Sequence, residues 1–325
     1  MYIDHFHLST MPFQLTPDSH FFFESREHRR AIAHLLYGLS QEEGFIIITG
    51  EIGAGKTMLV EHLWSQLDTN DFVGARIATT QVTGDDLLKL VAHGFGLEFA
   101  AADKATMLRR LQTFFEDVQS ASKKCLLVID EVQNLPMSAL EELRMLSNLT
   151  VSGRAPFQCL LLGQPQFRQT LVDPRLEQVQ QRVLASCHLG PLSSSETREY
   201  IEHRLRTAGW TGDPSFEDEA HSAIHRTAEG IPRRINILCS RLLLAAYLDD
   251  THDITEGMVR EVAGELRRDL MAGHERPTTK PSTANGEIPH TLDARLVSIE
   301  QSIAKHDRAI KRALEITAQI LEIRT

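Results

Sequence analysis

The first two thirds of the chain alternate between short, continuous apolar runs and longer amphipathic stretches. An apolar run without alternation predicts a strand that is buried on both faces, as in a parallel sheet. Amphipathic stretches with apolar residues every three or four positions predict helices between such strands. The expected strands cover residues 45–49, 73–80, 125–129, 157–163 and 186–192. This order predicts an α/β fold, a three-layer α/β/α parallel sheet of the P-loop NTPase type.

Helical patterns occupy the intervals between these runs and all of the following segment. Ser25 is an expected N-cap for a helix over 26–39. Further helices are expected within the α/β part at 58–63, 85–91, 105–118, 138–149 and 195–207. From Ser215 onward only helical patterns remain, at 216–227, 233–248 and 255–270. A small all-α lid subdomain is therefore expected to follow the sheet.

These patterns divide the chain into five parts, at 1–24, 25–210, 211–271, 272–290 and 291–325. The first is rich in aromatic residues and is expected to pack on the α/β core, or alternatively to contribute to an adenine pocket. The fourth is rich in proline and glycine and is expected to be a linker. The last carries an imperfect heptad seam that begins at Leu292 and Leu296. It predicts a coiled-coil-like helix that pairs with itself or a partner, or a single amphipathic helix that folds onto its own domain.

The formal net charge is -10 at pH 7, which gives no general attraction to nucleic acid or acidic lipid. A local basic patch remains compatible with this charge. The four cysteines are far apart and each lies in an apolar run, which favours buried free thiols over disulfides or zinc ligands. No apolar run approaches the roughly 20 residues of a membrane span, and the N-terminus lacks a signal-peptide pattern. These features predict a cytoplasmic protein.

The strand at 45–49 leads directly into a glycine-rich loop with the spacing Gly50-x-x-x-x-Gly55-Lys56-Thr57. This strand–loop–helix context is that of a phosphate-binding P-loop, whose backbone N–H groups turn toward phosphate oxygens. Lys56 is expected to reach the β- and γ-phosphates, and the Thr57 hydroxyl to hold Mg²⁺. The expected nucleotide-binding residues are Gly50, Glu51, Ile52, Gly53, Ala54, Gly55, Lys56, Thr57 and Met58.

The strand at 125–129 ends in a pair of carboxylates, Asp130 and Glu131. Asp130 is expected to bind the metal together with Thr57, while Glu131 polarises an attacking water. The strand and helices between the P-loop and this pair indicate the additional-strand class of P-loop ATPases. Because the chain has no guanine-reading Asn-Lys-x-Asp loop, the expected nucleotide is ATP with Mg²⁺.

Further polar residues occur where contacts to the γ-phosphate are expected. Gln164 follows the apolar strand at 157–163 and is a candidate for aligning water. Arg182 precedes the last strand and is a candidate for reaching the nucleotide of a neighbouring subunit. Such a guanidinium can contribute about 10³–10⁵ in rate. Arg175 and Arg168 remain alternatives for this role.

Two arginines open a helix of the expected lid. Arg233 and Arg234 follow Gly230-Ile231-Pro232, and either one is a candidate for bridging bound nucleotide to the lid. Such a bridge would couple hydrolysis to rotation of the lid.

In this order the motifs resemble those of the AAA+ ATPases. Residues 50–57 resemble Walker A, residues 126–131 resemble Walker B, Gln164 occupies the sensor 1 position, and residues 230–233 are similar to a sensor 2 motif. Several stretches over about 1–270 resemble the ExeA/GspA-type secretion ATPases, most closely the branch associated with exosortase (PEP-CTERM) loci. These stretches are Pro12-Phe13, Thr16-Pro17-Asp18, 51–57, Asp130-Glu131-Val132-Gln133-Asn134-Leu135, 141–148 and 162–168.

The resemblance implies ATP binding and hydrolysis, formation of a homo-oligomer, and a role near envelope export or exopolysaccharide assembly. ExeA-type proteins continue into a membrane span and a peptidoglycan-binding region, whereas this chain ends in the linker and heptad helix. We therefore expect the helix at 291–325 to dock on an inner-membrane partner. Two alternatives stay open: a DNA-binding transposition ATPase of the TniB/TnsC kind, and a nucleotide-gated switch whose tail recruits a partner.

Overall fold

The computed structural model describes residues 2–41, 44–68, 70–78, 83–98, 103–151, 153 and 155–272. The expected linker and heptad helix, apart from residue 272, lie outside the described residues.

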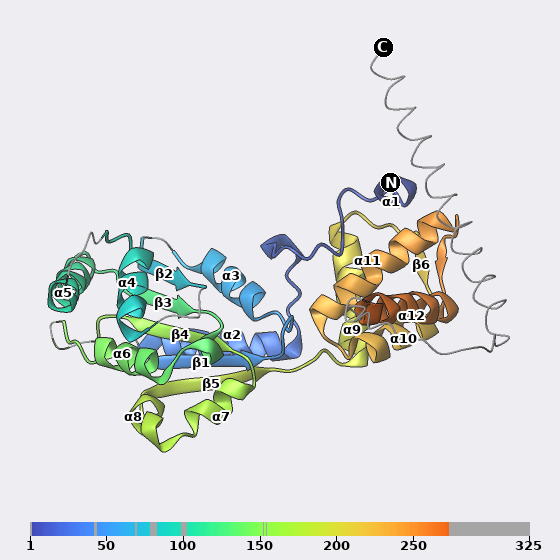
Figure 1. The fold of residues 1–325 in the computed structure, drawn as a ribbon. Coiled ribbons are helices and arrows are strands. Elements are labelled where there is room, and N and C mark those ends of the chain that lie inside the picture. The colour runs from blue at the N-terminus through green and yellow to red at the C-terminus, as the bar shows by residue number, and fades with distance from the viewer. Residues whose placement is uncertain are drawn as a thin grey trace, which may run out of the picture.

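A five-stranded sheet forms the centre of the first lobe (Figure 1). All of its strand pairs are parallel, in the order β2-β3-β4-β1-β5. The sequence prediction of a parallel α/β sheet is thus confirmed. The strands are β1 (Phe45–Gly50), β2 (Phe72–Ile77), β3 (Lys124–Ile129), β4 (Gln158–Gly163) and β5 (Val183–Leu189).

Helices cover both faces of the sheet, which gives the predicted three layers. Alternate side chains of β1 enter different clusters: Ile46 and Ile48 pack with α2 and α3, whereas Phe45 and Ile47 pack with α4, α5 and α6. The helices of this lobe are α2 (Arg26–Gln41), α3 (Lys56–Gln66), α4 (Gly84–Gly94), α5 (Lys104–Ser120), α6 (Met137–Ser147), α7 (Gln166–Leu171) and α8 (Glu177–Gln180).

The edge strand β5 lies three residues earlier than predicted, at Val183–Leu189 instead of 186–192. Its side chains alternate between exposed and buried, because the face that carries Ala185, Cys187 and Leu189 packs in the α2–α3 cluster while the intervening residues are exposed. It therefore lacks the continuous apolar run that marks the inner strands. The residues after it enter a connection in which Leu192 N donates to Gly230 O at 2.8 Å.

A second, mainly helical region follows β5. Its helices are α9 (Ser194–Thr207), α10 (Asp218–Ala228), α11 (Pro232–Leu248) and α12 (Glu256–Ala272). The helix expected from residue 216 begins only at Asp218, because β6 (Ser215–Phe216) pairs in parallel with β7 (Asp253–Ile254). Sequence periodicity gave no signal for this short two-stranded sheet.

The aromatic N-terminal segment, with α1 (Tyr2–His5) and the 3₁₀ turn η1 (Ser19–Phe21), lies mostly against the helical region (Figure 1). Tyr2, Phe6, Leu8 and Phe13 are buried in the same cluster as α9, α10, α11 and α12. Phe22, in contrast, packs with the α2–α3 cluster on the sheet. The segment therefore differs from the expected packing on the α/β core, since most of its apolar side chains enter the helical core.

Candidate nucleotide-binding site

The P-loop runs from the end of β1 to the start of α3 and has two glycines in the left-handed region. The φ angles of Gly53 and Gly55 are 85° and 98°. A Cβ on Gly53 would lie 2.4 Å from the Cβ of Arg233, and one on Gly55 would lie 2.8 Å from Nε2 of His28. Both conformation and space therefore require glycine, and the loop is closely packed between α2 and α11.

Lys56 lies over this loop at the carboxyl end of β1. Its Nζ donates to Gly50 O at 2.7 Å and to Glu51 O at 3.0 Å. Burial lowers the pKa of Lys56, and the nearby carboxylates of Asp130, Glu131 and Glu51 oppose this shift. The ammonium thus lies among the carbonyls and carboxylates of the site.

Asp130 follows β3 and meets the P-loop helix across β4, as expected for strands whose carboxyl ends share one edge. Thr57 Oγ1 donates to Asp130 Oδ2 at 3.3 Å. Arg76, on β2, donates to the same oxygen at 3.4 Å and also pairs with Glu61 on α3. A hydroxyl and a carboxylate oxygen in contact are ligands suited to a hard cation such as Mg²⁺, and the residues present fit that ion.

Glu131 adopts a left-handed conformation, with φ of 56°. Its N–H donates to Asp130 Oδ1 at 2.9 Å, and its Oε2 accepts from Gln133 Nε2 at 2.9 Å and from Asn134 Nδ2 at 3.4 Å. Gln164 follows β4, which lies between β1 and β3, and its backbone N donates to Gln133 Oε1 at 3.0 Å. The structure therefore brings Glu131 and Gln164 together through a third residue.

The two lid arginines are oriented differently at the start of α11. Arg233 N donates to Gly53 O at 3.2 Å, so the lid is hydrogen-bonded to the P-loop at this point. Arg234 instead pairs with Glu229. Of the two candidates, the structure places Arg233 beside the P-loop.

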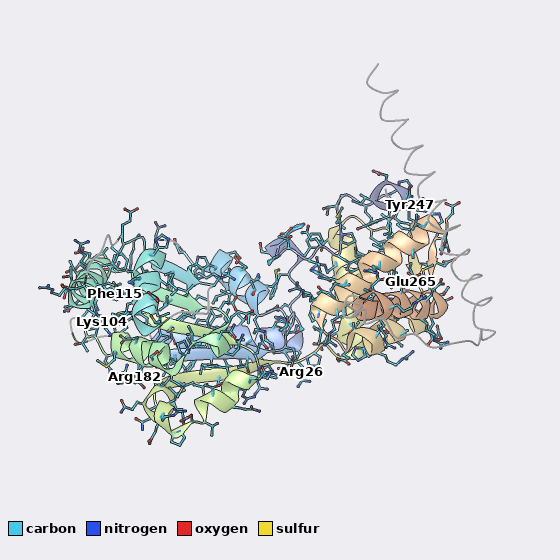
Figure 2. All side chains as sticks on the ribbon, in the orientation of Figure 1. Arg26, Lys104, Phe115, Arg182, Tyr247 and Glu265 are labelled. Carbon is cyan, nitrogen blue, oxygen red and sulfur yellow. The ribbon has the colours of Figure 1, made fainter. Side chains whose placement is uncertain are left out.

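Arg182 lies at the other end of the sheet. Its carbonyl accepts from Phe45 N at the beginning of β1, whereas the P-loop follows the end of that strand. Its guanidinium donates to Ser147 O at 2.9 Å and also contacts Asn148, at the end of α6. Figure 2 shows Arg182 in the left part of the α/β lobe and Arg26 on its right.

The two alternative arginines both lie in the segment between β4 and β5. Arg175 is exposed and pairs with Asp173 at 2.6 Å. Arg168, on α7, lines a surface groove of about 470 Å³ with Arg30, His34 and His188. Within the described residues, neither arginine donates a hydrogen bond to the P-loop.

The sequence prediction assigned no function to three residues that lie at the site: His28, Arg76 and Gln133. His28 is buried beside Gly55, and Ser25 Oγ lies 2.6 Å from its Nδ1. Burial lowers the pKa of His28 to about 4, and Glu196 opposes the shift. Only Gln133 had a signal, since it belongs to the stretch after Asp130-Glu131 that carries the family resemblance.

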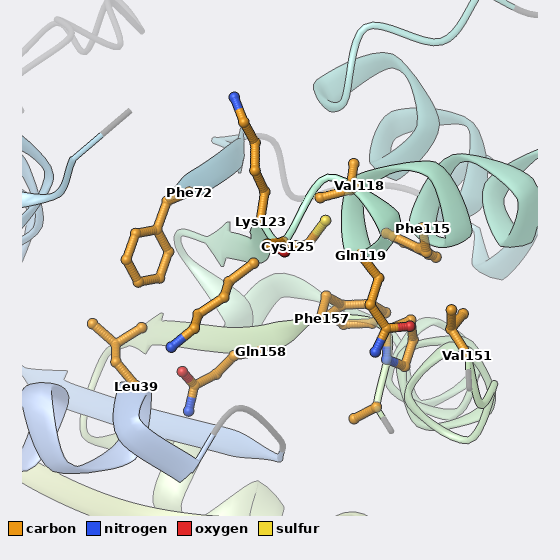
Figure 3. A pocket seen from close by; sticks show the side chains of 14 residues that line it. Leu39, Phe72, Phe115, Val118, Gln119, Lys123, Cys125, Val151, Phe157 and Gln158 are labelled. Atoms are coloured by element: carbon orange, nitrogen blue, oxygen red, sulfur yellow. The ribbon is translucent and has the colours of Figure 1, made fainter. Parts of the chain in front are cut away.

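Two further cavities are present, one at the beginning of α2 and one at the edge of the sheet opposite the P-loop. A cleft of about 1050 Å³ separates the beginning of α2 from the helical region and is lined by residues 23–27, 29, 191–193, 195–196, 199, 225–226 and 229. A smaller cavity of about 310 Å³ lies at the amino ends of β3 and β4, the edge opposite the P-loop (Figure 3). Phe72, Lys123 and Phe157 are among its lining residues.

The cysteines are all free: Cys125, Cys159 and Cys239 are buried, and Cys187 is half-buried. The prediction of free thiols is confirmed. Within the described ranges, the acidic, histidine and cysteine side chains form no group of three suited to a metal ion. None of the helices in the described part of the chain has the length and apolarity needed to cross a membrane.

The fold is an AAA P-loop fold: the family model described as AAA domain matches residues 39–171. The chain is 37% identical over 270 residues to General secretion pathway protein A of Aeromonas hydrophila, an alignment that covers 82% of this chain. It is also 30% identical over 174 residues, or 51% of this chain, to an uncharacterised HTH-type transcriptional regulator of Methanocaldococcus jannaschii. The chain spans less than half of each relative, 48% and 41% respectively.

Solved structures of low sequence identity share the fold. The ORC2 protein of Aeropyrum pernix has a TM-score of 0.59 at 17% identity, with 79% of this chain and 72% of that chain covered. The RuvB branch migration motor of Thermotoga maritima has a TM-score of 0.51 at 18% identity, with 76% and 70% covered. These similarities establish the fold.

Proposed function

We propose that the protein is a Mg²⁺-dependent ATPase that works as an oligomer. The observation that carries this proposal is the meeting of Lys56, Thr57 and Asp130 at one edge of the sheet, with Glu131 next in the chain. In this mechanism the P-loop N–H groups and Lys56 bind the β- and γ-phosphates. Thr57 and Asp130 would hold Mg²⁺, which when bound neutralises charge on the phosphates.

Glu131 then orients and polarises the attacking water, with Gln164 beside it. Arg233 contacts the nucleotide from the lid and couples its presence to the position of α11. Its hydrogen bond to Gly53 supports this role, because a phosphate entering the loop would lie close to the same turn. Arg182 acts on the nucleotide of an adjacent subunit, which its distance from its own P-loop supports.

Two substitutions separate binding from turnover. Glu131→Gln is expected to retain ATP with an affinity close to that of the wild type while turnover falls by about 10²–10⁴, the range of general base catalysis. Lys56→Ala is expected to lose ATP binding itself. Equilibrium binding of a fluorescent ATP analogue and phosphate release measure the two effects. Full turnover by Glu131→Gln would refute the assigned mechanism.

We further propose that ATP turnover drives or regulates an envelope export system linked to exopolysaccharide, with the protein acting where ATP is available, in the cytoplasm. The similarity to General secretion pathway protein A supports a secretion-associated role. The exosortase link and a docking role for 291–325 rest on the sequence resemblance. Capture of inner-membrane proteins with full-length chain, but not with a chain truncated after Ala272, tests this docking. Equal capture by both chains would exclude the tail.

Duplex DNA binding is the second candidate function. The groove lined by Arg30, His34, Arg168 and His188 supports it, while Glu27 in the same groove and the net charge of -10 oppose it. A DNA-binding ATPase should bind duplex DNA in the presence of ATP, with an affinity that falls steeply as salt rises. Absence of binding at low salt removes this candidate.

A further inference from the structure

We propose that Gln133 is a positioning residue that aligns Glu131 with the strand end at Gln164. The inference rests on the proposed ATPase function and deepens it, since it assigns a residue that controls the water-polarising carboxylate. Gln133 lies in the 3₁₀ turn η2 (Val132–Asn134), directly after the Asp130-Glu131 pair.

The side-chain amide of Gln133 is hydrogen-bonded at both ends. Its Nε2 donates to Glu131 Oε2 at 2.9 Å, and its Oε1 accepts from the backbone N of Gln164 at 3.0 Å. A carboxylate only accepts and a backbone N–H only donates, so the two partners fix the orientation of the amide. The glutamine amide matches these partners because it carries a donor nitrogen and an acceptor oxygen at the end of one side chain.

The turn that carries Gln133 is tightly packed against the end of β4. Val132 and Phe167 are almost completely buried. A Cβ on Gly163 would lie 2.9 Å from Val132 Cγ2 and 3.5 Å from Gln133 Oε1. Because there is no room between the two segments, a shift of Gln164 has to move Gln133 as well.

The conformation of Glu131 is also restricted by its own backbone. Its backbone is left-handed, a conformation that costs a non-glycine residue free energy and persists where surroundings enforce it. Its N–H is bound to Asp130 Oδ1. The carboxylate direction is therefore set by its donors, of which Gln133 at 2.9 Å is closer than Asn134 at 3.4 Å.

This arrangement links the two groups expected to contact the attacking water and the γ-phosphate. When Gln164 moves toward the phosphate, the Gln133 amide carries the displacement to the carboxylate of Glu131. Without the amide, Glu131 and Gln164 would occupy their positions independently. A misplacement of about 1 Å at a reacting group can cost about 10²-fold in rate.

The test uses the full chain and replaces Gln133 by Met, which keeps the length of the side chain and removes both hydrogen bonds. Gln133→Met is expected to lower kcat by about 10- to 100-fold while KM for ATP changes by less than about threefold. Gln133→Glu retains the acceptor for Gln164 N but faces Glu131 with a second carboxylate, and is expected to lose at least as much. Gln112→Ala, on the outer α5 where the amide contacts Glu116, is the matched control and should match the wild type.

A double mutant distinguishes positioning from general damage. If Gln133 acts through Glu131, adding Gln133→Met to Glu131→Gln leaves the residual single-turnover rate unchanged. Wild-type kcat in Gln133→Met, or losses that multiply in the double mutant, would overturn the inference while leaving the ATPase intact. A wild-type chain without ATP turnover would instead overturn the proposed function, and this inference with it.

Discussion

His28 is a titratable residue that packs against the P-loop. Its ring is only 5% exposed, lies against Gly55, and is oriented by Ser25 at 2.6 Å. Burial holds its pKa at about 4, below the ordinary value of 6.5, and the charged group that opposes this shift is Glu196. The imidazole beside the loop is therefore neutral at pH 7.

The free energy of unfolding should consequently decrease as the pH is lowered through a defined window. Between pH 6.5 and 4 the unfolded chain binds a proton at His28 that the folded chain does not, so this contribution is fully present above pH 6.5 and is lost as pH falls toward 4. At 1.36 kcal/mol per pKa unit the loss amounts to about 3 kcal/mol. Urea unfolding at several pH values checks it.

Other histidines with lowered pKa, His203 and His221, act in the same direction, so the contribution of His28 needs a difference measurement. His28→Gln should have a shallower pH dependence than the wild type in this window. Parallel curves for the two proteins would contradict the assignment. The comparison uses the slope of the unfolding free energy against pH, because the substitution by Gln also alters the contact with Ser25.

Prediction from sequence worked for site residues that a strand end positions. Thr57 and Asp130 follow parallel strands, and parallel strands place their carboxyl ends at one edge; their contact was therefore foreseeable. His28 and Arg76 reach the site from α2 and β2, and no local pattern distinguishes them from solvated helix or strand residues. Their contacts depend on tertiary packing, which a single sequence does not specify.

At the scale of elements, the sequence pattern predicted the buried inner strands but not the bounds of the edge strand or the short β6–β7 pair. The inner strands β1, β3 and β4 are continuous apolar runs, whereas β5 alternates and was displaced by three residues. The β6–β7 pair contains two residues in each strand and is held together across 38 positions, from Ser215 to Asp253. Such a pairing has no periodicity that a window along the sequence can detect.

A buried arginine of α9 binds the N-terminal segment. Arg204 is 6% exposed and donates to the carbonyls of Pro12 and Gln14, and its guanidinium lies 4.7 Å from the centre of the Phe21 ring. Carbonyls from an irregular segment need such a donor when they are buried. Arg204 thus supplies these two carbonyls with the donor that a strand or helix partner would otherwise provide.

Arg204→Ala should therefore loosen the segment more than the rest of the fold. We expect a loss of about 2–3 kcal/mol, because a charged donor is removed and buried carbonyls lose their partner. Hydrogen exchange should rise most in peptides spanning 9–16. Arg206→Ala, which removes an exposed pair with Glu202 on the same helix, should cost less than about 0.5 kcal/mol. Equal effects of the two substitutions would argue against the anchoring role.

At the scale of the whole molecule, the P-loop and Arg182 lie at opposite edges of the sheet. The P-loop, Asp130 and Glu131 lie at the carboxyl edge, whereas Arg182 precedes β5 at the amino edge. The five steps from Phe45 to Gly50 in β1, at about 3.3 Å each, put roughly 16 Å between the two edges. This is farther than an arginine side chain can span, so Arg182 has no access to the nucleotide of its own chain.

A mixed oligomer tests whether Arg182 completes the site of a neighbour. Arg182→Ala alone should lose about 10³-fold or more in turnover, as expected for a guanidinium that stabilises phosphoryl transfer in trans. Lys56→Ala alone should be inactive because it binds no ATP. Mixing the two restores an interface with an intact P-loop on one side and an intact arginine on the other, and phosphate release should recover.

The control mixture combines Arg182→Ala with the double mutant Lys56→Ala/Arg182→Ala, which contributes no arginine and should stay inactive. Recovery in both mixtures would exclude Arg182 as the source of the effect. The same design with Arg175→Ala or Arg168→Ala in place of Arg182→Ala decides among the three arginines, because only the true trans residue loses activity alone and regains it beside Lys56→Ala. Failure of all three mixtures, with oligomers verified by light scattering, would mean that each subunit hydrolyses ATP without a neighbour's arginine.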